Sequence, residues 1–521
     1  MRRVEIRRDG QLSDTACDHE GVPDWTYHPL RPPAQRLLGR RRSLRAALRV
    51  LAGLISLPGG ARLVAAVSAR PDVSPGLAGR LGATVPVRHA RDALRALPVL
   101  GAGVIEIGPV TADDVPFVLA AVAQRKCLVF VWTADPAVAV TLGPHVDRVS
   151  VGAASDVVHL TEPGVAEAGL ALAQPDKIVL ATPGVLVAAG PGWFQRVIEA
   201  ETRTAAAPGL RDVGRDPRRW PGWWWGLVVG AGMIGAGLGA AIITVGPVLL
   251  WYDNEYLGMN REQLAALNKH LVSFLQHDRI TMAGTMIAIG VLYAGLAWGG
   301  IRQGWPWART SYLVSGMFGF PSLLFFLGSG FLEPLHAAVA VLLFPMFVLA
   351  VFRRPDEPRW SRSPEGPSRI RLRALTGQLL MIGTGLGLLI GGLVVSVVGL
   401  TDVFVATDLD FLNSHAGPLH EANPRLLPFI AHDRAGFGGA LVSAALAIIT
   451  LSAWGWRRAE AWVWWTLAGA AAAGFGPVVV VHLVIGYTHW DHLAPVYLGI
   501  GLTGVALALS YPYLSAPKAA D

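Results

Sequence analysis

The sequence is poor in cysteine and in charged residues, and its first half has no asparagine. The only cysteines among its 521 residues are Cys17 and Cys127, and the absence of a CxxC pair excludes a zinc knuckle and a dithiol redox motif. Charged residues make up 16% of the chain, against about 25% in soluble globular domains. No cluster interleaves basic and aromatic residues, which argues against nucleic-acid binding. The mean hydropathy of +0.44 points instead to a membrane protein.

The N-terminus also lacks the features of a signal peptide, because no apolar core follows its first arginines within about 30 residues. The stretch from Leu44 to Ala69 is apolar, but Arg45, Arg49 and Arg62 interrupt it. Such a pattern predicts an amphipathic or buried helix and not a membrane span. Residues 1–59 are therefore expected to form an N-terminal segment with an amphipathic helix.

Eight apolar segments in the second half are long enough to cross a bilayer, which takes about 20 residues. The predicted spans are about 223–251, 280–300, 307–328, 331–352, 375–401, 435–454, 461–485 and 492–513. Tryptophans at both ends of the first span are typical of the interface between lipid and water. The sequence thus predicts an all-α, multi-pass unit whose partner is the lipid bilayer.

Arginines occur in alternate loops of this unit: before span one and between spans two and three, four and five, and six and seven. Loops rich in arginine remain on the cytoplasmic side. We therefore expect a protein of the cell membrane whose N-terminal domain and C-terminus are both cytoplasmic. The even number of predicted spans agrees with this orientation.

An internal similarity recurs at an offset of 155 residues. Residues 253–257 (DNEYL) match 408–412 (DLDFL), and the pattern FxxHDR occurs at both 274–279 and 429–434. Rare residue types in ungapped register predict a duplication. Two tandem four-helix repeats are expected, at 222–352 and 375–515, with a basic cytoplasmic linker at 353–374. Repeats of equal topology would be related by a pseudo-twofold axis along the membrane normal.

The repeated polar residues fall at the outer ends of the predicted spans, where ionisable groups are costly unless they are paired or functional. Histidine and carboxylate groups could hold a metal ion or relay protons. The candidate metal ligands are Asp253, Glu255, His277, Asp278, His336, Asp408, Asp410, His432, Asp433 and His492. A structural interpretation stays open, in which Asp278 and Asp433 cap helices and Arg279 and Arg434 pair with acids across the loop.

Residues 60–210 alternate short apolar runs with helical patterns, as in 103–108 and 127–132. This alternation predicts an α/β domain with parallel strands. A complete eightfold barrel takes about 250 residues, so only a reduced barrel resembling a TIM barrel fits.

Two parts of this domain resemble the membrane-associated (class 2) dihydroorotate dehydrogenases. Residues 100–111 read LGAGVIEIGPVT and are similar to that family's strand LGFGFVEIGTVT. Residues 179–184 (VLATPG) and 190–198 (GPGWFQRVI) are similar to its closing segments. The resemblance implies a flavin mononucleotide bordered by Gly108, Thr182 and Gly184, with membrane quinone as the electron acceptor.

The sequence also departs from that family where the family's chemistry lies. Residues 85–92 (VPVRHARD) replace its AAGFDK segment, and Pro109 stands where the family has a serine or threonine. The central block, with its substrate asparagines, catalytic base and phosphate loop, is missing, and no asparagine precedes Asn254. These departures imply a degenerate domain without dehydrogenase activity.

Three functions are compatible with the sequence. The first is an integral membrane protein of undetermined activity with a non-catalytic, dehydrogenase-like cytoplasmic domain. The second is a flavin-dependent, quinone-linked oxidoreductase similar to dihydroorotate dehydrogenase, which rests on family analogy. The third is a metal-dependent membrane enzyme or metal-handling protein that works through the His/Asp groups at the outer face. The span centres carry almost no ionisable residue, which argues against ion-coupled transport.

Overall fold

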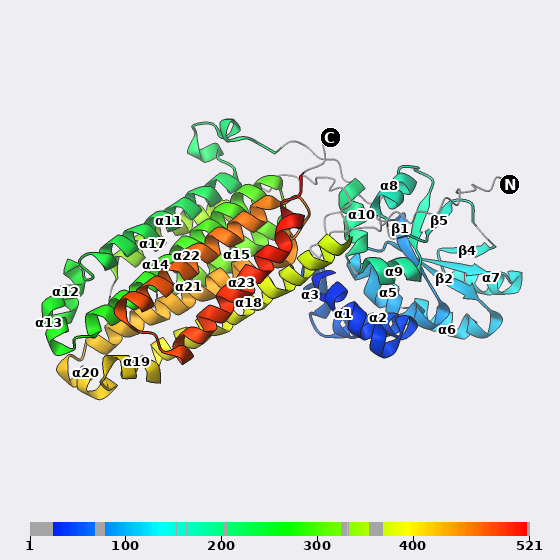
Figure 1. The fold of residues 1–521 in the computed structure, drawn as a ribbon. Helices are drawn as coiled ribbons and strands as arrows, with labels where there is room; N and C mark the ends of the chain where they lie inside the picture. Colours follow the sequence, from blue (N-terminus) through cyan, green and yellow to red (C-terminus); the bar gives the residue numbers. More distant parts are fainter. Residues whose placement is uncertain are drawn as a thin grey trace. The chain divides into compact units, whose positions relative to one another are not determined.

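The computed structural model divides into two compact units (Figure 1). The α/β unit comprises Met1–Thr202, Arg362–Leu375 and Lys518–Asp521, and the helical unit comprises Arg203–Ser361 and Thr376–Pro517. The residues that the structure describes are 24–67, 79–123, 125–152, 154–162, 164–190, 192–201, 207–324, 331, 333–353 and 368–517.

The α/β unit is built on one sheet of six parallel strands in the order β4-β3-β2-β1-β6-β5. The strands are β1 Leu81–Val85, β2 Val104–Val110, β3 Leu128–Thr133, β4 Arg148–Val151, β5 Val157–Leu160 and β6 Ile178–Ala181. Each strand is a short run rich in valine, leucine and isoleucine, as is usual where both faces of a parallel sheet are covered. The predicted α/β domain with parallel strands is confirmed.

The strand order is that of a barrel opened between β4 and β5. Only residues 152–156 separate these two strands, too few for the crossover helix that would let them pair in parallel. In a flat sheet β2 and β5 would lie about 14 Å apart, yet Glu106 Oε2 of β2 lies 2.6 Å from His159 Nε2 of β5. The sheet is therefore curled into a half-barrel.

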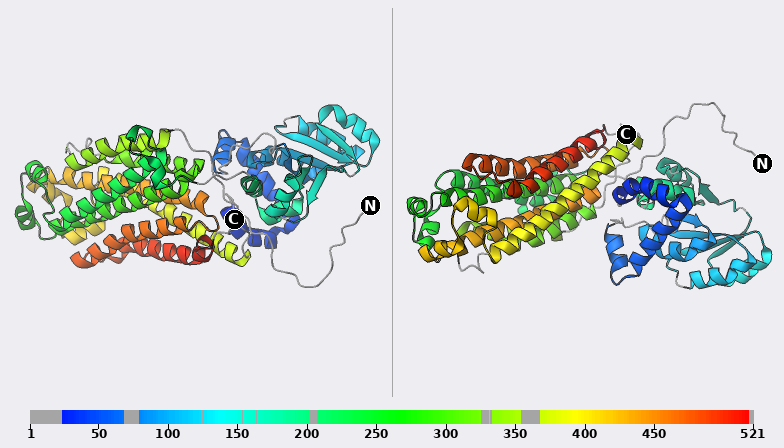
Figure 2. Two further views of the ribbon diagram at one scale, coloured as in Figure 1. Left: turned by 90° about the horizontal axis from the view of Figure 1, so that it is seen from above. Right: turned by 60° about the horizontal axis from the view of Figure 1, so that its bottom comes forward.

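Helices cover the outer face of the half-barrel, as the further views in Figure 2 show. They are α5 Ala90–Leu100, α6 Val115–Val122, α7 Pro136–Leu142, α8 Val165–Leu172, α9 Pro183–Ala189 and α10 Trp193–Glu201. Alternate strand residues such as Ala83, Ile105 and Val131 bury themselves against these helices. The other strand face carries a smaller apolar cluster of Val104, Phe130 and Leu180.

The N-terminal segment contains three helices, α1 Asp24–Leu38, α2 Arg40–Ser56 and α3 Gly60–Val67. The single helix expected from Leu44 to Ala69 is divided, because Pro58 and Gly59 interrupt it and Gly59 has a φ of 77°. Leu48 and Ala52 of α2 are buried in the core of the α/β unit. The arginines at 45, 49 and 62 remain exposed, so the predicted amphipathic character is present.

The helical unit contains seven helices that are long and apolar enough to cross a membrane, counted over the described residues. They are α11 Gly222–Val245, α14 Leu271–Gly295 with its extension to Gln303, α17 Pro334–Phe352, α18 Ser368–Leu400, α21 Leu426–Gly455, α22 Ala461–Ile485 and α23 Trp490–Leu514. The remaining predicted span, 307–328, falls on the 17-residue helix α15 Pro306–Ser322 and extends into residues 325–330, outside the described part of the chain. A multi-pass membrane protein is the coarse prediction that these helices support.

Several predicted span boundaries differ from the observed helices; the sixth span, for instance, was expected from residue 435, but α21 begins at Leu426. The first span was expected to reach residue 251, but α11 ends at Val245, because Gly246 and Pro247 interrupt the helix. The second was expected to begin near residue 280, but α14 begins at Leu271. Polar residues at the start of α14 shorten its apolar stretch without shortening the helix.

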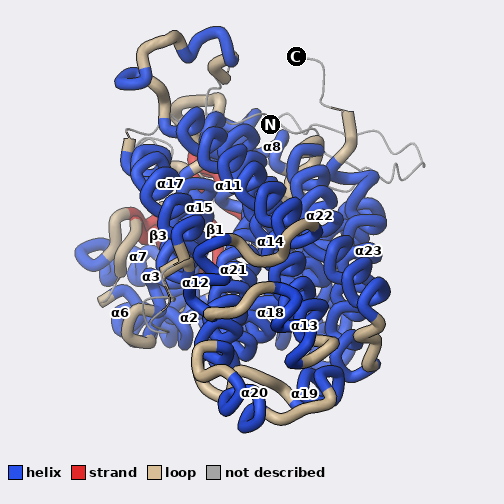
Figure 3. The backbone as a smooth tube through the Cα atoms, turned by 90° about the vertical axis from the view of Figure 1, so that its left-hand side faces the viewer, coloured by secondary structure: helices blue, strands red, loops and turns tan. Residues whose placement is uncertain are grey.

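Four short helices lie together at one end of the helical unit (Figures 1 and 3). They are α12 Trp251–Leu257, α13 Arg261–Leu267, α19 Ala406–Leu412 and α20 Ala416–Ala422. Below them the long helices pack closely through small residues. A Cβ on Gly237 would lie 2.8 Å from Ala283 O, and a Cβ on Gly392 would lie 2.8 Å from Gly438 O. The same close approach therefore joins α11 to α14 and α18 to α21.

The contact between Glu106 and His159 predicts a pH-dependent stability of the α/β unit. The hydrogen bond to Glu106 raises the pKa of His159 above its ordinary 6.5. The pair therefore stabilises the fold below that pH, and the contribution is lost as the pH rises through the pKa of the folded state. His159 is partly exposed, so we expect about 1 kcal/mol or less.

Pulse proteolysis of the intact protein in urea, across neutral pH, measures this contribution. Glu106→Gln should flatten the pH dependence relative to the wild type. Identical pH profiles for the two proteins would show that the pair adds nothing to stability.

Candidate functional site

Two aspartates lie in the first turn of the short helices α12 and α19, at the end of the helical unit. Asp253 Oδ2 accepts a hydrogen bond from Leu250 N at 2.9 Å, and Asp408 Oδ2 accepts one from Val405 N at 2.8 Å. Each carboxylate thereby satisfies a backbone N–H at the start of α12 or α19. Both side chains are buried, so each needs a positive partner.

Two arginines, each in the third turn of a long helix, provide the positive charge. Arg279 of α14 lies 3.0 Å from Asp253 and 2.9 Å from Asp433 of α21. In the same way Arg434 of α21 lies 2.5 Å from Asp408 and 3.2 Å from Asp278 of α14. Each arginine therefore joins an acid of its own half of the helical unit to an acid of the other half.

Further contacts of these arginines also occur in matched pairs. Arg279 donates to Val248 O at 2.7 Å and Arg434 donates to Val403 O at 2.8 Å. The guanidinium of Arg279 lies 5.0 Å from the ring centre of Phe429, and that of Arg434 lies 4.9 Å from Phe274. Cation–π contacts of this kind stabilise a desolvated guanidinium.

The interhelical loops repeat the pattern. Asn268 Nδ2 donates to Leu412 O at 2.8 Å, and Asn423 Nδ2 donates to Leu257 O at 2.9 Å. The contacts described so far have counterparts 155 positions along the chain. The two halves thus exchange equivalent interactions.

The predicted acidic ligands do not all meet. Asp278 and Asp433 lie within α14 and α21 and bond to arginine, so they are not helix caps as the structural interpretation expected; Asp253 and Asp408 occupy that role. Glu255 and Asp410 are exposed. The ion pairs also cross between the two halves of the helical unit.

Three histidines do come together. His277 of α14, His482 of α22 and His492 of α23 each present a ring nitrogen, and these three atoms lie within 4.8 Å of one another. His277 and His482 are buried and His492 is partly buried. Gly284 of α14 allows the helices to approach, since a Cβ there would lie 2.7 Å from Ala473 O of α22.

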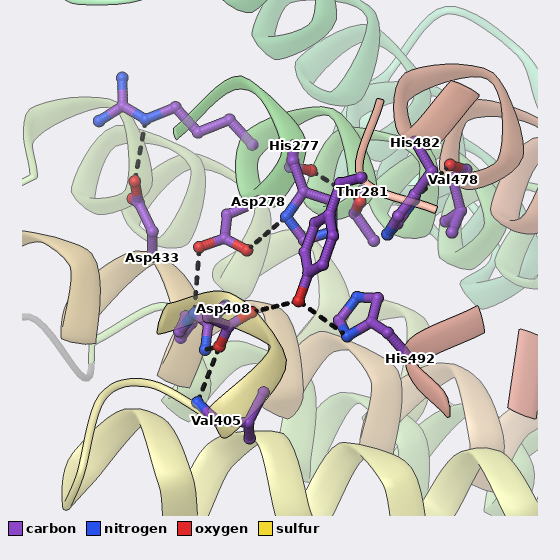
Figure 4. A network of polar contacts seen from close by, with 12 residues as sticks. His277, Asp278, Thr281, Val405, Asp408, Asp433, Val478, His482 and His492 are labelled. Carbon is purple, nitrogen blue, oxygen red and sulfur yellow. Dashed lines mark hydrogen bonds and ion pairs between the residues drawn. The ribbon is translucent and has the colours of Figure 1, made fainter. Parts of the chain in front are cut away.

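Each of the three imidazoles has its Nδ1 atom close to a neighbouring polar group (Figure 4). His277 Nδ1 lies 3.0 Å from Asp278 Oδ1, and His482 Nδ1 lies 2.7 Å from Val478 O. His492 Nδ1 lies 3.2 Å from the hydroxyl of Tyr487. Partners of this type orient metal-binding histidines and fix their tautomers. His482 Nε2 is buried without a hydrogen-bond partner among the described residues, and so is His277 Nδ1.

Tyr487 connects this histidine group to the arginine–aspartate pairs. Its hydroxyl donates to Asp408 Oδ1 at 2.8 Å, so it must accept the N–H of His492. Burial and the nearby Asp408 carboxylate raise the pKa of Tyr487 far above its ordinary value. The phenol therefore stays protonated. His492 then donates to the Tyr487 oxygen, and the Tyr487 hydroxyl donates to Asp408.

The matched place in the other half has a different composition. His336 Nδ1 lies 3.2 Å from His432 Nε2, so two histidines meet here as well. In this part of the chain the second half has one additional residue, so the offset between matched positions is 156. Phe331 then corresponds to Tyr487, and Glu333 corresponds to His489. Glu333 accepts a hydrogen bond from the Tyr252 hydroxyl at 2.7 Å. No group of three histidines, cysteines or acids with metal spacing occurs here among the described residues.

Two important residues escaped the sequence-based list. His482 lies in the last turns of an apolar span, and Tyr487 lies in the short connection after it. An ionisable residue inside a span is itself a signal, and this could have identified His482. Nothing in the sequence indicates that His277, from the other half, completes the group.

The residues proposed to border a flavin lie at the carboxyl ends of β2 and β6. A Cβ on Gly108 would lie 2.7 Å from Trp132 O, so Trp132 fills the space beside it. Thr182 precedes α9 and Gly184 lies in its first turn. Glu106, two residues before Gly108 on β2, lies 2.6 Å from His159 of β5 through its Oε2 atom.

Comparison with protein-family models, curated proteins and solved structures gives no match for this chain. The geometry alone therefore carries the functional argument.

The arginine–aspartate pairs predict a large effect of removing one charge. Arg434→Gln leaves Asp278 and Asp408 buried without their cation, which costs about 3–5 kcal/mol. The melting temperature of the purified protein in detergent should fall by roughly 10 °C. Arg425→Gln is the matched control, because the contacts of the Arg425 guanidinium with Tyr256 are an exposed bond to its O atom and a ring contact at 5.8 Å, with no buried acid.

Adding Asp278→Asn to Arg434→Gln removes one unpaired carboxylate and should restore part of the loss. Equal melting temperatures for the Arg434 and Arg425 variants would contradict the role given to the buried pairs.

Proposed function

We propose that this chain is an integral membrane protein that binds a transition-metal ion through His277, His482 and His492. The observation that carries the proposal is the convergence of three imidazoles from three helices, with ring nitrogens within 4.8 Å of one another. The Nδ1 atoms of His482 and His492 are in hydrogen-bond contact with neighbours, and His277 Nδ1 lies 3.0 Å from Asp278 Oδ1.

The donor set indicates the class of metal. Imidazole nitrogens suit zinc, copper, iron and nickel, whereas magnesium and calcium take oxygen ligands. Three protein ligands leave a coordination position open, which distinguishes such a site from a closed structural one. The bound ion could therefore exchange or meet a further ligand.

The surrounding acids favour metal binding or transfer over metal-assisted hydrolysis. Hydrolysis needs a general base near the ion. Asp278 and Asp408 are the nearest carboxylates, and Arg434 binds both of them. Tyr487 donates to Asp408 and stays protonated, so it cannot take a proton either.

We further propose that the helical unit is an internal duplication of a four-helix unit with eight spans. The supporting observation is the set of matched contacts at an offset of 155, including the backbone. Val248 and Val403 both have a positive φ, 69° and 66°, which is rare for a β-branched residue.

The same proposal places the histidine group on the outer side of the cell membrane. Arg302, Arg353 and Arg457 follow the carboxyl ends of the helices that extend from α14, α17 and α21. The histidine group lies toward the opposite ends of α14 and α22. Arginine-rich ends remain cytoplasmic, so the histidines would face outward.

For the α/β unit we propose a reduced, non-catalytic relative of the dihydroorotate dehydrogenases. The connection of five residues between β4 and β5 supports this, because the missing central block of that family would fall there.

Metal analysis of the purified protein tests the proposed function. We expect about one transition-metal ion per chain after loading and desalting, because the three imidazoles form one site. His482→Ala should lower the affinity at least about tenfold, the effect of losing an orienting or ligating group. His420→Ala is the matched control, since His420 is exposed on α20.

Equal metal content in the wild type, His482→Ala and His420→Ala would show that the bound ion lies elsewhere. No metal in any of the three would refute the proposal.

The proposed orientation is tested by cysteine accessibility in whole cells. In a background with Cys17→Ser and Cys127→Ser, a cysteine is introduced at exposed His415 or at exposed Pro517. A thiol reagent that cannot cross membranes should label His415→Cys in intact cells and Pro517→Cys only after lysis. Labelling of both in intact cells, or of Pro517→Cys alone, would contradict the orientation.

A further inference from the structure

Methionines of the helical unit gather around one cavity. The chain has eight methionines, and Met233, Met282 and Met286 line the same cavity between α11, α14, α15 and α21. Met282 and Met286 are four residues apart on α14 and so lie on one face of it. Met233 faces them from α11, which approaches α14 closely at Gly237.

The size of the cavity limits its occupant. It offers about 20 Å³ to the centre of a water-sized sphere, little more than one water molecule needs. An ion or a water molecule fits, whereas a quinone or a flavin does not. The hydroxyl-bearing residues Ser322, Ser443 and Tyr293 are the polar members of its lining.

This cavity is separate from the histidine group. Met282 lies five residues after His277 on α14, about 7.5 Å along the helix axis and roughly 140° around it. The methionines therefore line the side of α14 that faces α11 and α21, while His277 faces α22 and α23. An ion could not contact both groups at once.

Both groups consist of neutral donors. Thioethers are soft ligands that select Cu(I), and imidazole also accepts copper. The nearest carboxylates are bound by arginine, so neither group supplies a negative charge to the ion. Because the cost of burying an ion grows with the square of its charge, neutral donors in a membrane favour a monovalent ion over a divalent one.

We propose that the metal of this protein is Cu(I), and that the chain holds it at two places: the histidine group and the methionine cavity. This inference rests on the proposed metal-binding function and adds the identity of the ion and a second site. The competing explanation for the methionines is gap filling, since the flexible side chain adapts to irregular cores.

Anaerobic titration of the full-length protein in detergent tests the inference. The probes are Cu(I) as its acetonitrile complex, competed by a chromophoric Cu(I) chelator, and Zn(II) under the same conditions. We expect about two Cu(I) ions per chain in the wild type and about one in Met282→Leu/Met286→Leu, because leucine keeps the volume and removes the sulfur. Met317→Leu is the matched control, since Met317 is 57% exposed. Zn(II) binding should not respond to either methionine change.

X-ray absorption of the copper-loaded wild type adds a measurement that needs no variant. Sulfur and nitrogen scatterers together support the two sites. An unchanged Cu(I) stoichiometry in the double variant, without sulfur scattering, overturns the methionine site. Binding of Zn(II) but not Cu(I), lost in His482→Ala, overturns the choice of copper and leaves the proposed function intact. Binding of neither ion refutes both.

Discussion

The crossed pairing of two arginines with four aspartates is the interaction on which the helical unit depends. Arg279 and Arg434 are almost completely enclosed, and so are their acidic partners. An isolated buried charge costs several kcal/mol, so none of these groups is tolerable without the others. Because each arginine bonds to an acid on its own short helix and to one on the opposite long helix, the pairs fix α12 and α19 against α14 and α21 at the same time.

The arginine–aspartate pairs contact the residues that surround the histidine group. Asp278 bonds to Arg434 with one oxygen and faces His277 with the other. Asp408 likewise bonds to Arg434 and accepts from Tyr487, which holds His492. One arginine thus orients two of the three imidazoles through their carboxylate neighbours, while it cancels the negative charge that would otherwise reach the ion. Because Arg434 pairs with both carboxylates, the groups that remain to bind an ion are the neutral imidazoles.

The sequence predicted the parallel α/β sheet and most long apolar helices, because hydrophobic periodicity and length are local properties. It also singled out the two FxxHDR segments and the acids Asp253 and Asp408 without showing how they pair. The pairing escaped because an offset of 155 residues says which positions are equivalent, but not whether equivalent residues meet within a half or across it. The end of α11 was misplaced because Gly246 and Pro247 stop a helix inside an apolar run. His482 was passed over because it has no matched histidine among the described residues.

The two halves share their buried ion pairs and differ around the histidines among the described residues. The ion pairs, the asparagine contacts and the positive φ of Val248 and Val403 occur in both halves. Loss of either member of an ion pair would leave a buried charge unpaired. Around the histidines this constraint is absent. Phe331 cannot accept the N–H that Tyr487 accepts, so His336 bonds to His432 instead and both rings use a nitrogen that an ion would need. Under the proposed duplication, the ion pairs therefore occur twice, whereas the proposed metal site occurs once, where Tyr487 orients His492 beside His277 of the other half.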